Sequence, residues 1–464
     1  MSTYADTIEY SGSMASVKKS RLNRFARIFF TAAVFIISLI VILSSGLHHS
    51  ELFDILNIFI ALICSVSLFS YQSRPYSLYK ILHIFVLFFF CIAPSIQFKN
   101  DVRFFDTRFF EEDYLLTSGY VFVILLLYNA IYIIFDKKIK FEDYKYHRNV
   151  EYKRISLSQE ILFLSISSII CLLFLYINKF NIYSLLFRGG EFVNRIEISQ
   201  ITFLITDFFL RPMVMILFMT ACILRVKHKI VLFLLGLLMV VCAPPTGMAR
   251  FAAAALYIPV IVWFAPILRK RNVFVVFFIF GLLVVFPFID VFRTNSEQAI
   301  TSVLQFSQFK ELHFDSYSMF MRVLKDNIIT DGRQLLGVFL FWVPRTIWID
   351  KPLGSGHFVA EIQDLYFSNL SMPYFSEGFV NFGNIGVFVF VTIIAYFTAR
   401  TDKKYWIIIE KQKMDVRRII YLMTLGLFFL VLRGDLMSSF AYLCGFILSY
   451  KTIYLLVRKN IVNM

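Results

Sequence analysis

The sequence predicts an all-α polytopic integral membrane protein with about twelve transmembrane helices. Its 464 residues are 59% hydrophobic and only 17% charged, and the mean hydropathy is +0.72. This composition is too apolar for a soluble chain of this length. Several runs of about 20 apolar residues are each long enough to cross a hydrocarbon core of ~30 Å. Because a helix satisfies its own backbone hydrogen bonds within one run, these runs are predicted to be helices.

The spans follow one another along most of the chain. The first follows the basic stretch KKSRLNRFAR, which favours a retained span over a cleaved signal peptide. The seventh is short and ends in CAPPTG (242–247), so we expect it to end before the interface. The predicted spans are 28–46, 52–71, 80–97, 115–135, 159–177, 201–224, 230–243, 250–268, 272–290, 383–400, 418–433 and 438–457.

The net charge is +15. The way the basic residues are distributed indicates how the chain is oriented in the membrane, rather than nucleic-acid binding. If the spans alternate, the basic clusters KKSRLNRFAR, DKKIKFEDYKYHRNVEYKR, RVKHK, RKR and KQKMDVRR all fall on one side. The positive-inside rule places that side, and both termini, in the cytoplasm. The cations are dispersed among connections and form no basic groove, so nucleic acid is excluded as a partner.

Familiar motifs of soluble enzymes do not occur in the chain. The six cysteines lie in or at the ends of spans and form no CxxC, so neither a disulfide framework nor a thiolate metal site is predicted. HExxH, Walker A and GxGxxG patterns do not occur either. We therefore predict no metal and no cofactor.

An unusually long connection divides the chain into three parts. Residues 1–290 hold spans one to nine, 291–382 form a large outer loop, and 383–464 hold spans ten to twelve. Loops of this length are usually functional. Within the loop, 296–312 and 313–326 are predicted to be amphipathic helices along the membrane surface.

The stretch FWVPRTIWIDKPLGSG (341–356) stands out within that loop. Prolines stiffen a loop, and glycines allow close backbone approach. Arg345 and Lys351 are suited to phosphate oxygens, and Trp342 and Trp348 to sugar stacking. The alternative is an interfacial anchor, with tryptophan at the headgroup level.

Further cations are predicted on the outer side. Arg211 lies in the middle of a span, where a charge normally faces the bundle interior and is functional; the alternatives are an interhelical salt bridge or snorkelling. Several arginines facing one outer cavity would make a pyrophosphate site. The predicted pyrophosphate- or substrate-binding residues are Arg188, Arg195, Arg211, Arg250, Arg293, Arg345, Lys351 and Arg433.

Four motifs carry a resemblance to a known family. PRTIWIDKPLGSG (344–356), SEGFVNFGNIG (376–386), APPTGMAR (243–250) and LRGD (432–435), together with the topology, resemble O-antigen polymerases. That family has an Arg-x10-Gly pattern in each of two outer loops. Arg345 and Gly356 fit it in the long loop. After span five, Lys179 and Gly190 have the spacing, with lysine in place of arginine.

The resemblance implies a GT-C-like fold and a glycosyltransferase in the bacterial inner membrane with its active site facing the periplasm. The donor would be a growing glycan on undecaprenyl pyrophosphate, and the acceptor one repeat unit on the same carrier.

Two alternatives remain: a ligase that moves glycan to lipid A core, and a flippase for lipid-linked oligosaccharide. A flippase usually shows two related halves, which this sequence lacks. A polysaccharide chain-length regulator is an open candidate for a partner.

Such a reaction needs a base for the attacking hydroxyl and positive charge for the leaving pyrophosphate. His313 and Asp315 in HFDSY, and Glu377 in SEGF, are the candidate catalytic residues. Asp315 has a structural alternative, an ion pair with Arg322 two helical turns away. Glu377 has another, a charge at a helix N-terminus. Which of the three is the base stays open in the sequence.

Overall fold

The computed structural model describes residues 24–70, 74–139, 156–181, 185–186, 200–248, 250–270, 272–285, 306–368, 370–409 and 416–461. Every regular element in these ranges is a helix, which confirms the all-α prediction. Eight helices have the length and composition to cross a membrane, and the polytopic membrane prediction is confirmed to that extent. They are Arg24–Ile42, Glu51–Phe69, Leu78–Lys99, Glu111–Lys138, Leu157–Ile177, Leu204–Ile223, Tyr374–Ile407 and Leu436–Leu456.

Shorter helices occupy the other four predicted spans. They are Lys229–Cys242, Ala252–Phe264 and Val273–Val285, and α18 (Arg417–Arg433), which has 17 residues. Each is shorter than the roughly 20 residues that a perpendicular crossing needs. The predicted shortness of the seventh segment is confirmed, since its helix has 14 residues and ends at Cys242, before the proline pair. The total of twelve spans stays a prediction.

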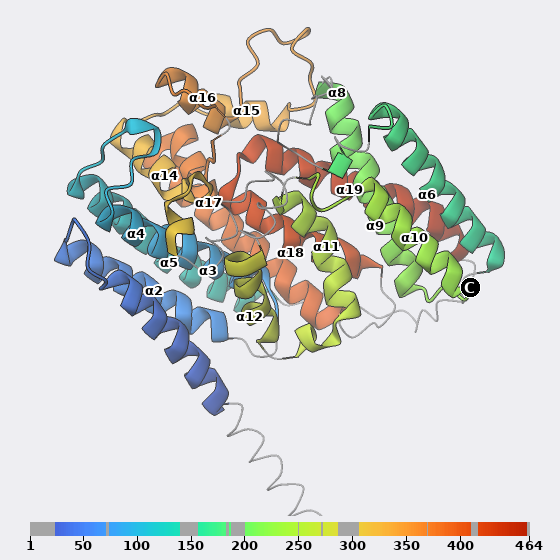
Figure 1. Ribbon diagram of the computed structural model, residues 1–464, viewed down its shortest axis with the longest axis horizontal. Helices are drawn as coiled ribbons and strands as arrows, with labels where there is room; N and C mark the ends of the chain where they lie inside the picture. Colours follow the sequence, from blue (N-terminus) through green and yellow to red (C-terminus); the bar gives the residue numbers. More distant parts are fainter. Residues whose placement is uncertain are drawn as a thin grey trace, which may run out of the picture.

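The helices pack around two neighbouring hydrophobic cores. In Figure 1 the first group lies at the left and the second at the right, with α11 and α18 in the centre contributing to both cores. The first core includes α2 (Glu51–Phe69), α3 (Leu78–Leu87), α4 (Ala93–Lys99), α5 (Glu111–Lys138), α12 (Val273–Phe280) and α17 (Tyr374–Lys404). The second includes α6 (Leu157–Ile177), α9 (Arg211–Ile223), α10 (Lys229–Cys242), α11 (Arg250–Phe264) and α19 (Leu436–Ile461).

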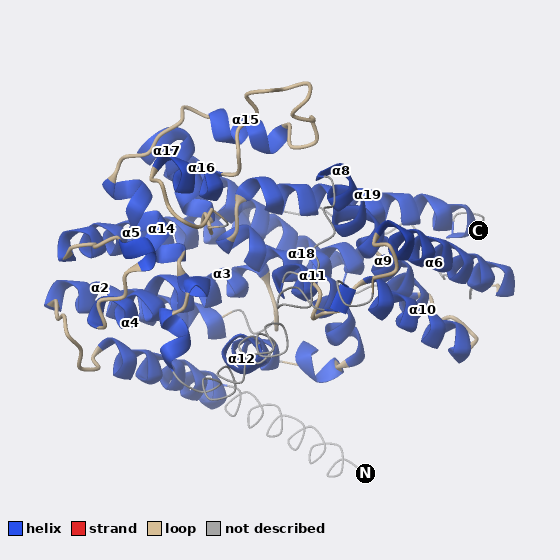
Figure 2. Cartoon of the chain, turned by 45° about the horizontal axis from the view of Figure 1, so that its top comes forward, coloured by secondary structure: helices blue, strands red, loops and turns tan. Residues whose placement is uncertain are grey.

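Short helical turns connect or interrupt the long helices. One π-helical turn, Phe88–Ile92, joins α3 to α4 just before Pro94, which cannot donate a backbone hydrogen bond. The other short turns, of either π or 3-10 type, are Phe104–Asp106, Leu204–Leu210, Pro266–Arg269, Gly281–Val285, Phe306–Lys310, Leu312–Phe314 and Tyr405–Ile409. The remaining short α-helices are α8 (Gln200–Phe203), α14 (Ser316–Lys325), α15 (Arg333–Phe339) and α16 (Ser355–Ile362). Figure 2 shows α15 and α16 at one edge of the bundle.

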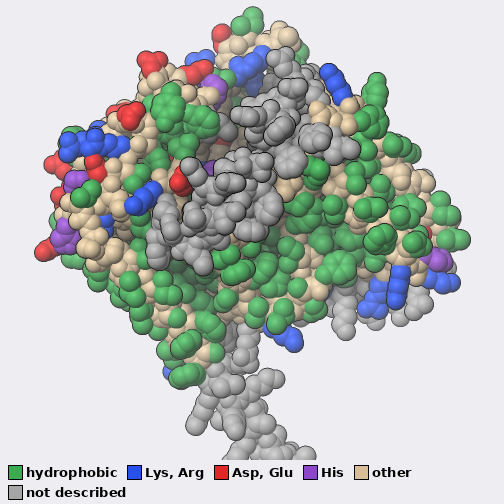
Figure 3. Space-filling model, viewed as in Figure 1, with side chains coloured by type: hydrophobic (Ala, Val, Ile, Leu, Met, Phe, Trp, Pro, Cys, Tyr) green, Lys and Arg blue, Asp and Glu red, His purple; other side chains and the backbone are tan. Residues whose placement is uncertain are grey.

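The outward surface is largely apolar. Hydrophobic side chains cover much of the lower and right parts of the face in Figure 3, and charged side chains gather mainly toward its margins. Large apolar residues such as Ile55 and Phe59 on α2, and Ile169 and Leu172 on α6, are exposed. A continuous apolar exterior on long helices is what a bilayer requires.

The segment 313–326 corrects one prediction. It was expected to lie along the membrane surface, but Ser316 to Leu324 of α14 are all buried. The helix packs against both α5 and α17. Because these helices cover it, its polar residues Ser316, Ser318 and Arg322 are buried together with its apolar side chains, and its amphipathic sequence does not place it at the membrane surface. Most of the other predicted helix, 296–312, lies outside the described residues.

The motif SEGFVNFGNIG forms a sharp break in α17. Gly383 has φ +58° and ψ −143°, a conformation that only glycine adopts readily. A Cβ atom added to Gly386 would overlap the carbonyl oxygen of Gly378. These two glycines would be ~12 Å apart in a straight helix. The break therefore folds the first two turns of α17 back against the spanning part.

Candidate functional site

Three separate segments meet at the Asp315 carboxylate, which is buried. Ser371 donates to it twice, from its backbone N at 3.2 Å and from its Oγ at 2.6 Å. Arg433 forms an ion pair with it at 3.2 Å. The Nε of Arg433 also donates to the backbone carbonyl of His313 at 3.0 Å. Arg433 therefore fixes both predicted catalytic residues of HFDSY, and the His313 side chain is exposed beside it.

The predicted alternative for Asp315, an ion pair with Arg322, is wrong. Arg322 instead donates to the Oγ1 of Thr107 at 2.7 Å and to the side chain of Gln363. Its guanidinium also lies 5.6 Å from the ring centroid of Phe109. The reason is positional, since Asp315 precedes α14 and its carboxylate turns toward Ser371 and away from the helix.

Two further carboxylates, Glu377 and Asp435, lie next to each other in the same region. Glu377 is completely buried; Ser355 Oγ donates to its Oε2 at 2.7 Å, and the backbone N of Leu436 to its Oε1 at 2.9 Å. Asp435 accepts from the backbone N of Met437 at 2.9 Å and of Gly356 at 3.4 Å. Burial raises the pKa of the Asp435 carboxyl. Both carboxylates thus face helix N-termini, where anions are stabilised. Glu377 also lies in the first turn of its own helix, as the alternative for it proposed.

The motif LRGD joins the two carboxylate groups. Its arginine, Arg433, binds Asp315, and its aspartate, Asp435, lies at the Glu377 side. The structure therefore brings His313, Asp315, Glu377 and Arg433 together from three distant parts of the sequence. Asp435 and Ser355 were missed, although both stand within motifs that the sequence singled out. Ser371 was also missed, and no sequence signal marks it.

Two glycines let the backbone approach this cluster closely, which confirms their predicted use. A Cβ atom on Gly354 would overlap the carboxylate of Asp435, and one on Gly356 would overlap the carbonyl oxygen of Leu370. The second obstacle is backbone, which cannot move aside as a flexible side chain would.

We expect Gly356→Ala to destabilise the protein by about 1–3 kcal/mol, because the added methyl displaces the backbone at Leu370. Chemical unfolding of the detergent-solubilised protein measures this. Gly119→Ala on α5 is the matched control: nothing lies within 4 Å of its added Cβ, and alanine favours a helix. Equal stability of the two variants would show that the contact at Gly356 relaxes without cost.

The two cations of FWVPRTIWIDKPLGSG (341–356) hold that loop in shape. Arg345 donates to the carbonyls of Lys351 at 2.7 Å and Pro352 at 3.4 Å. Lys351 is buried and donates to the carbonyls of Phe341 at 2.6 Å and Val343 at 2.9 Å. Burial, and then the nearby charge of Arg345, lowers the pKa of Lys351. Arg345 is exposed, so its charge still faces solvent.

The other predicted cations are placed as follows. Arg211 is buried, pairs with Asp207 one turn earlier, and lies 4.9 Å from the ring centroid of Phe174. Its salt bridge is thus within one helix rather than between helices. Arg250 begins α11, and its side chain lies outside the description, as do Arg188, Arg195 and Arg293 entirely. Convergence of all eight cations on one cavity stays a prediction.

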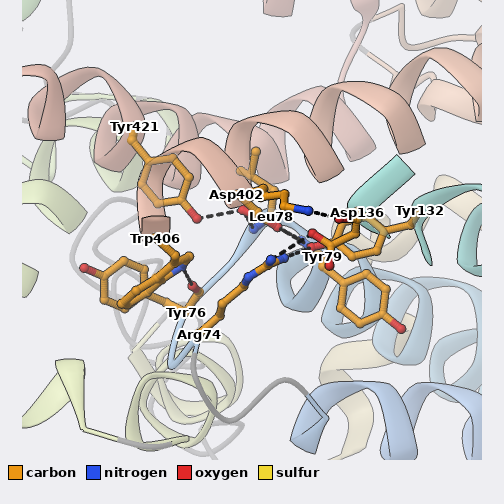
Figure 4. Close-up of polar contacts among 10 residues, drawn as sticks. Arg74, Tyr76, Leu78, Tyr79, Tyr132, Asp136, Asp402, Trp406 and Tyr421 are labelled. Atoms are coloured by element: carbon orange, nitrogen blue, oxygen red, sulfur yellow. Dashed lines mark hydrogen bonds and ion pairs between the residues drawn. The ribbon is translucent and has the colours of Figure 1, made fainter. Parts of the chain in front are cut away.

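A further polar cluster, which sequence reasoning missed, lies near the opposite end of α17 (Figure 4). Asp402 is fully buried and accepts from the backbone N of Leu78 and Tyr79 and from the hydroxyls of Tyr132 and Tyr421, at 2.7–3.2 Å. Arg74 reaches the same cluster. It donates to the Tyr132 hydroxyl at 3.0 Å and pairs with Asp136 at 2.8 Å. Each donor or acceptor in this set has a partner, so the arrangement is a structural clamp between α3, α5, α17 and α18.

No protein-family profile, no curated protein sequence and no solved structure matches this chain. Within the described residues, no group of three or more histidine, cysteine or acidic side chains could hold a metal ion. The resemblance to O-antigen polymerases therefore rests on the four motifs and the order of the spans. Three of those motifs contribute side chains or backbone to the cluster around Asp315 and Glu377.

Proposed function

We propose that this chain is a glycosyltransferase that polymerises undecaprenyl-pyrophosphate-linked repeat units into O-antigen polysaccharide. The proposal includes a position in the bacterial inner membrane with this cluster at the periplasmic face. One observation carries it: HFD, SEG, GSG and LRGD supply a histidine, carboxylates and an arginine to one place in the bundle. A base and a cation in one place are what glycosyl transfer from a pyrophosphate donor needs.

His313 is the best placed general base of the three candidates. Asp315 and Glu377 are buried, and hydrogen bonds engage both oxygens of each carboxylate. His313 is exposed, and its backbone is held by Arg433. In the proposed step, its imidazole takes the proton of the acceptor sugar hydroxyl as that oxygen bonds to the anomeric carbon. The bond from that carbon to the carrier pyrophosphate breaks, and the pyrophosphate leaves with the electron pair.

The buried carboxylates act as positioning groups in this proposal. Asp315 holds Arg433, which in turn holds the backbone of His313. Glu377 joins the first turn of α17 to the start of α19. That start follows Arg433 closely in the chain, so the bond also helps to hold the Arg433 segment. Positive charge for the leaving pyrophosphate comes from exposed Arg345 and from the predicted contributions of Arg188, Arg195 and Arg293.

The purified protein in nanodiscs, supplied with lipid-linked repeat units, tests the function. A ladder of longer products on a gel is expected. Transfer that occurs only when lipid A core is added would favour the ligase. Unchanged substrate from intact protein would contradict both enzyme functions, and its movement across a sealed vesicle would favour the flippase.

Arg345→Ala is expected to lower the elongation rate by about 30-fold to 1,000-fold, if this cation stabilises the departing pyrophosphate. Arg345→Lys should fail nearly as badly, because lysine cannot make two parallel hydrogen bonds. Ladder formation at matched membrane abundance measures both.

Arg333→Ala is the control for loop shape, because Arg333 is a neighbouring exposed cation that donates to the carbonyl of Asp350 in the same loop. It is expected to change the rate less than about threefold, since one exposed hydrogen bond contributes little. Normal ladders from both Arg345 variants would make the loop a scaffold and move the leaving-group site elsewhere.

A further inference from the structure

A small cavity lies between the N-terminus of α2, the end of α4 and the start of α5. Its volume is about 170 Å³. Charged and histidine side chains gather at the left margin of the face in Figure 3, over these helices. The lining residues on which the argument depends are His48, Asp101, Arg103, Arg108, Phe110 and Tyr114. None of them belongs to the cluster around Asp315 and Glu377.

The permanent charges that line this cavity balance one another. Arg103 forms an ion pair with Asp101, and His48 lies 3.7 Å from the same carboxylate. Arg108 and Glu111 are the remaining permanent charges of the lining. The lining thus holds two guanidinium groups and two carboxylates, and their charges cancel. A phosphate site needs an excess of positive charge, so this lining favours an uncharged ligand with many hydrogen-bonding groups.

Aromatic rings form the other part of the lining. The ring of Phe110 is exposed, and the guanidinium of Arg108 lies 5.6 Å from its centroid, whereas the rings of Phe98 and Tyr114, 4.8 Å apart, are nearly buried. Aromatic faces beside planar hydrogen-bonding groups offer an apolar surface and polar edges within one small space. A sugar ring has the matching surfaces, with apolar C–H faces and hydroxyl groups around its edge.

The backbone of the loop that encloses the cavity is strained. Asp101, Phe105 and Asp106 have φ of 50°, 59° and 53°, which is unfavourable for residues other than glycine. Such conformations persist where the surroundings impose them, and they cluster at ligand sites. Here Arg322 holds the loop to α14 through Thr107, at 2.7 Å.

The same wall continues into the segment that carries His313. Gln97 donates to the carbonyls of Phe309 at 2.9 Å and Phe314 at 3.0 Å. Lys310 donates to the side chain of Asn100 at 2.7 Å. The end of α4 that lines the cavity is therefore hydrogen-bonded directly to the segment that carries the proposed base.

From these observations we infer that the cavity is a saccharide subsite that binds one uncharged sugar ring of the lipid-linked glycan. The inference rests on the proposed function for the identity of the glycan, and on the cavity itself for the class of ligand. Holding a distal sugar here would fix the chain while its reacting end is at His313.

Saturation-transfer NMR tests the subsite without any need for activity. The full chain in nanodiscs is mixed in turn with glucose, galactose, mannose and N-acetylglucosamine. We expect saturation transfer to at least one sugar, and its loss in Arg108→Ala and Phe110→Ala. Arg400→Ala is the matched control. Arg400 is also an exposed arginine over an aromatic ring, since its guanidinium lies 5.9 Å from the ring centroid of Tyr396, but it stands near the C-terminal end of α17, away from the cavity. Inorganic pyrophosphate should not displace the sugar.

Steady-state elongation gives the second readout. With lipid-linked repeat units, Arg108→Ala and Phe110→Ala should raise KM by about 10-fold, equivalent to the loss of one good contact, and change kcat less. No saturation transfer to any sugar, transfer that both variants retain, or displacement by pyrophosphate would each overturn the subsite. A wild-type chain that binds a sugar but makes no ladder would overturn the proposed function and leave the subsite standing.

Discussion

His313→Ala is expected to slow elongation by about 10²-fold to 10⁴-fold, the usual contribution of a general base. The His313 side chain is exposed, whereas the carboxylates of Asp315 and Glu377 are buried. Protein abundance should be unchanged, because an exposed side chain contributes little to stability. Ladder formation over time, at equal protein, measures the loss.

Chemical rescue separates a base from a merely structural residue. Added imidazole should partly restore His313→Ala or His313→Gly. His357→Ala is the control, because His357 is another histidine of the same outer segment, half-buried on α16, and it pairs with Glu361. An unchanged rate for His313→Ala would remove histidine from the mechanism.

Asp402→Ala is expected to destabilise the protein by about 3–5 kcal/mol, the cost of removing one partner from a buried charged network. Two backbone N–H groups and two tyrosine hydroxyls would lose this acceptor (Figure 4). Asp402→Asn should cost less, because one acceptor oxygen remains while the amide group faces donors.

Unfolding in mixed detergent measures the effect, with Glu112→Ala as the control. Glu112 is an exposed carboxylate in the first turn of α5, and its loss should cost under ~1 kcal/mol. If Asp402→Ala is as stable as the control, the clamp between α3, α5, α17 and α18 does not contribute to holding that end of the bundle.

Much of the candidate site was within reach of the sequence, because its residues stand in short polar motifs among apolar helices. His313, Asp315, Glu377 and Arg433 were named, and three of the four share direct contacts. Ser371 was out of reach, because a serine in a polar loop carries no signal until its carboxylate partner is known. Asp402 was out of reach for a similar reason, since it follows a span directly and stands beside lysines that explain its charge.

The sequence by itself determined the helical membrane architecture, because hydropathy is a local property and about 20 apolar residues in a row have few other solutions. It also determined where glycines allow close approach, as at Gly354 and Gly356. Only the tertiary structure decided that α14 is buried, and that Asp315 pairs with Arg433 rather than Arg322. Those outcomes depend on contacts between residues more than 50 positions apart. Their geometry follows from helix packing, which no local pattern encodes.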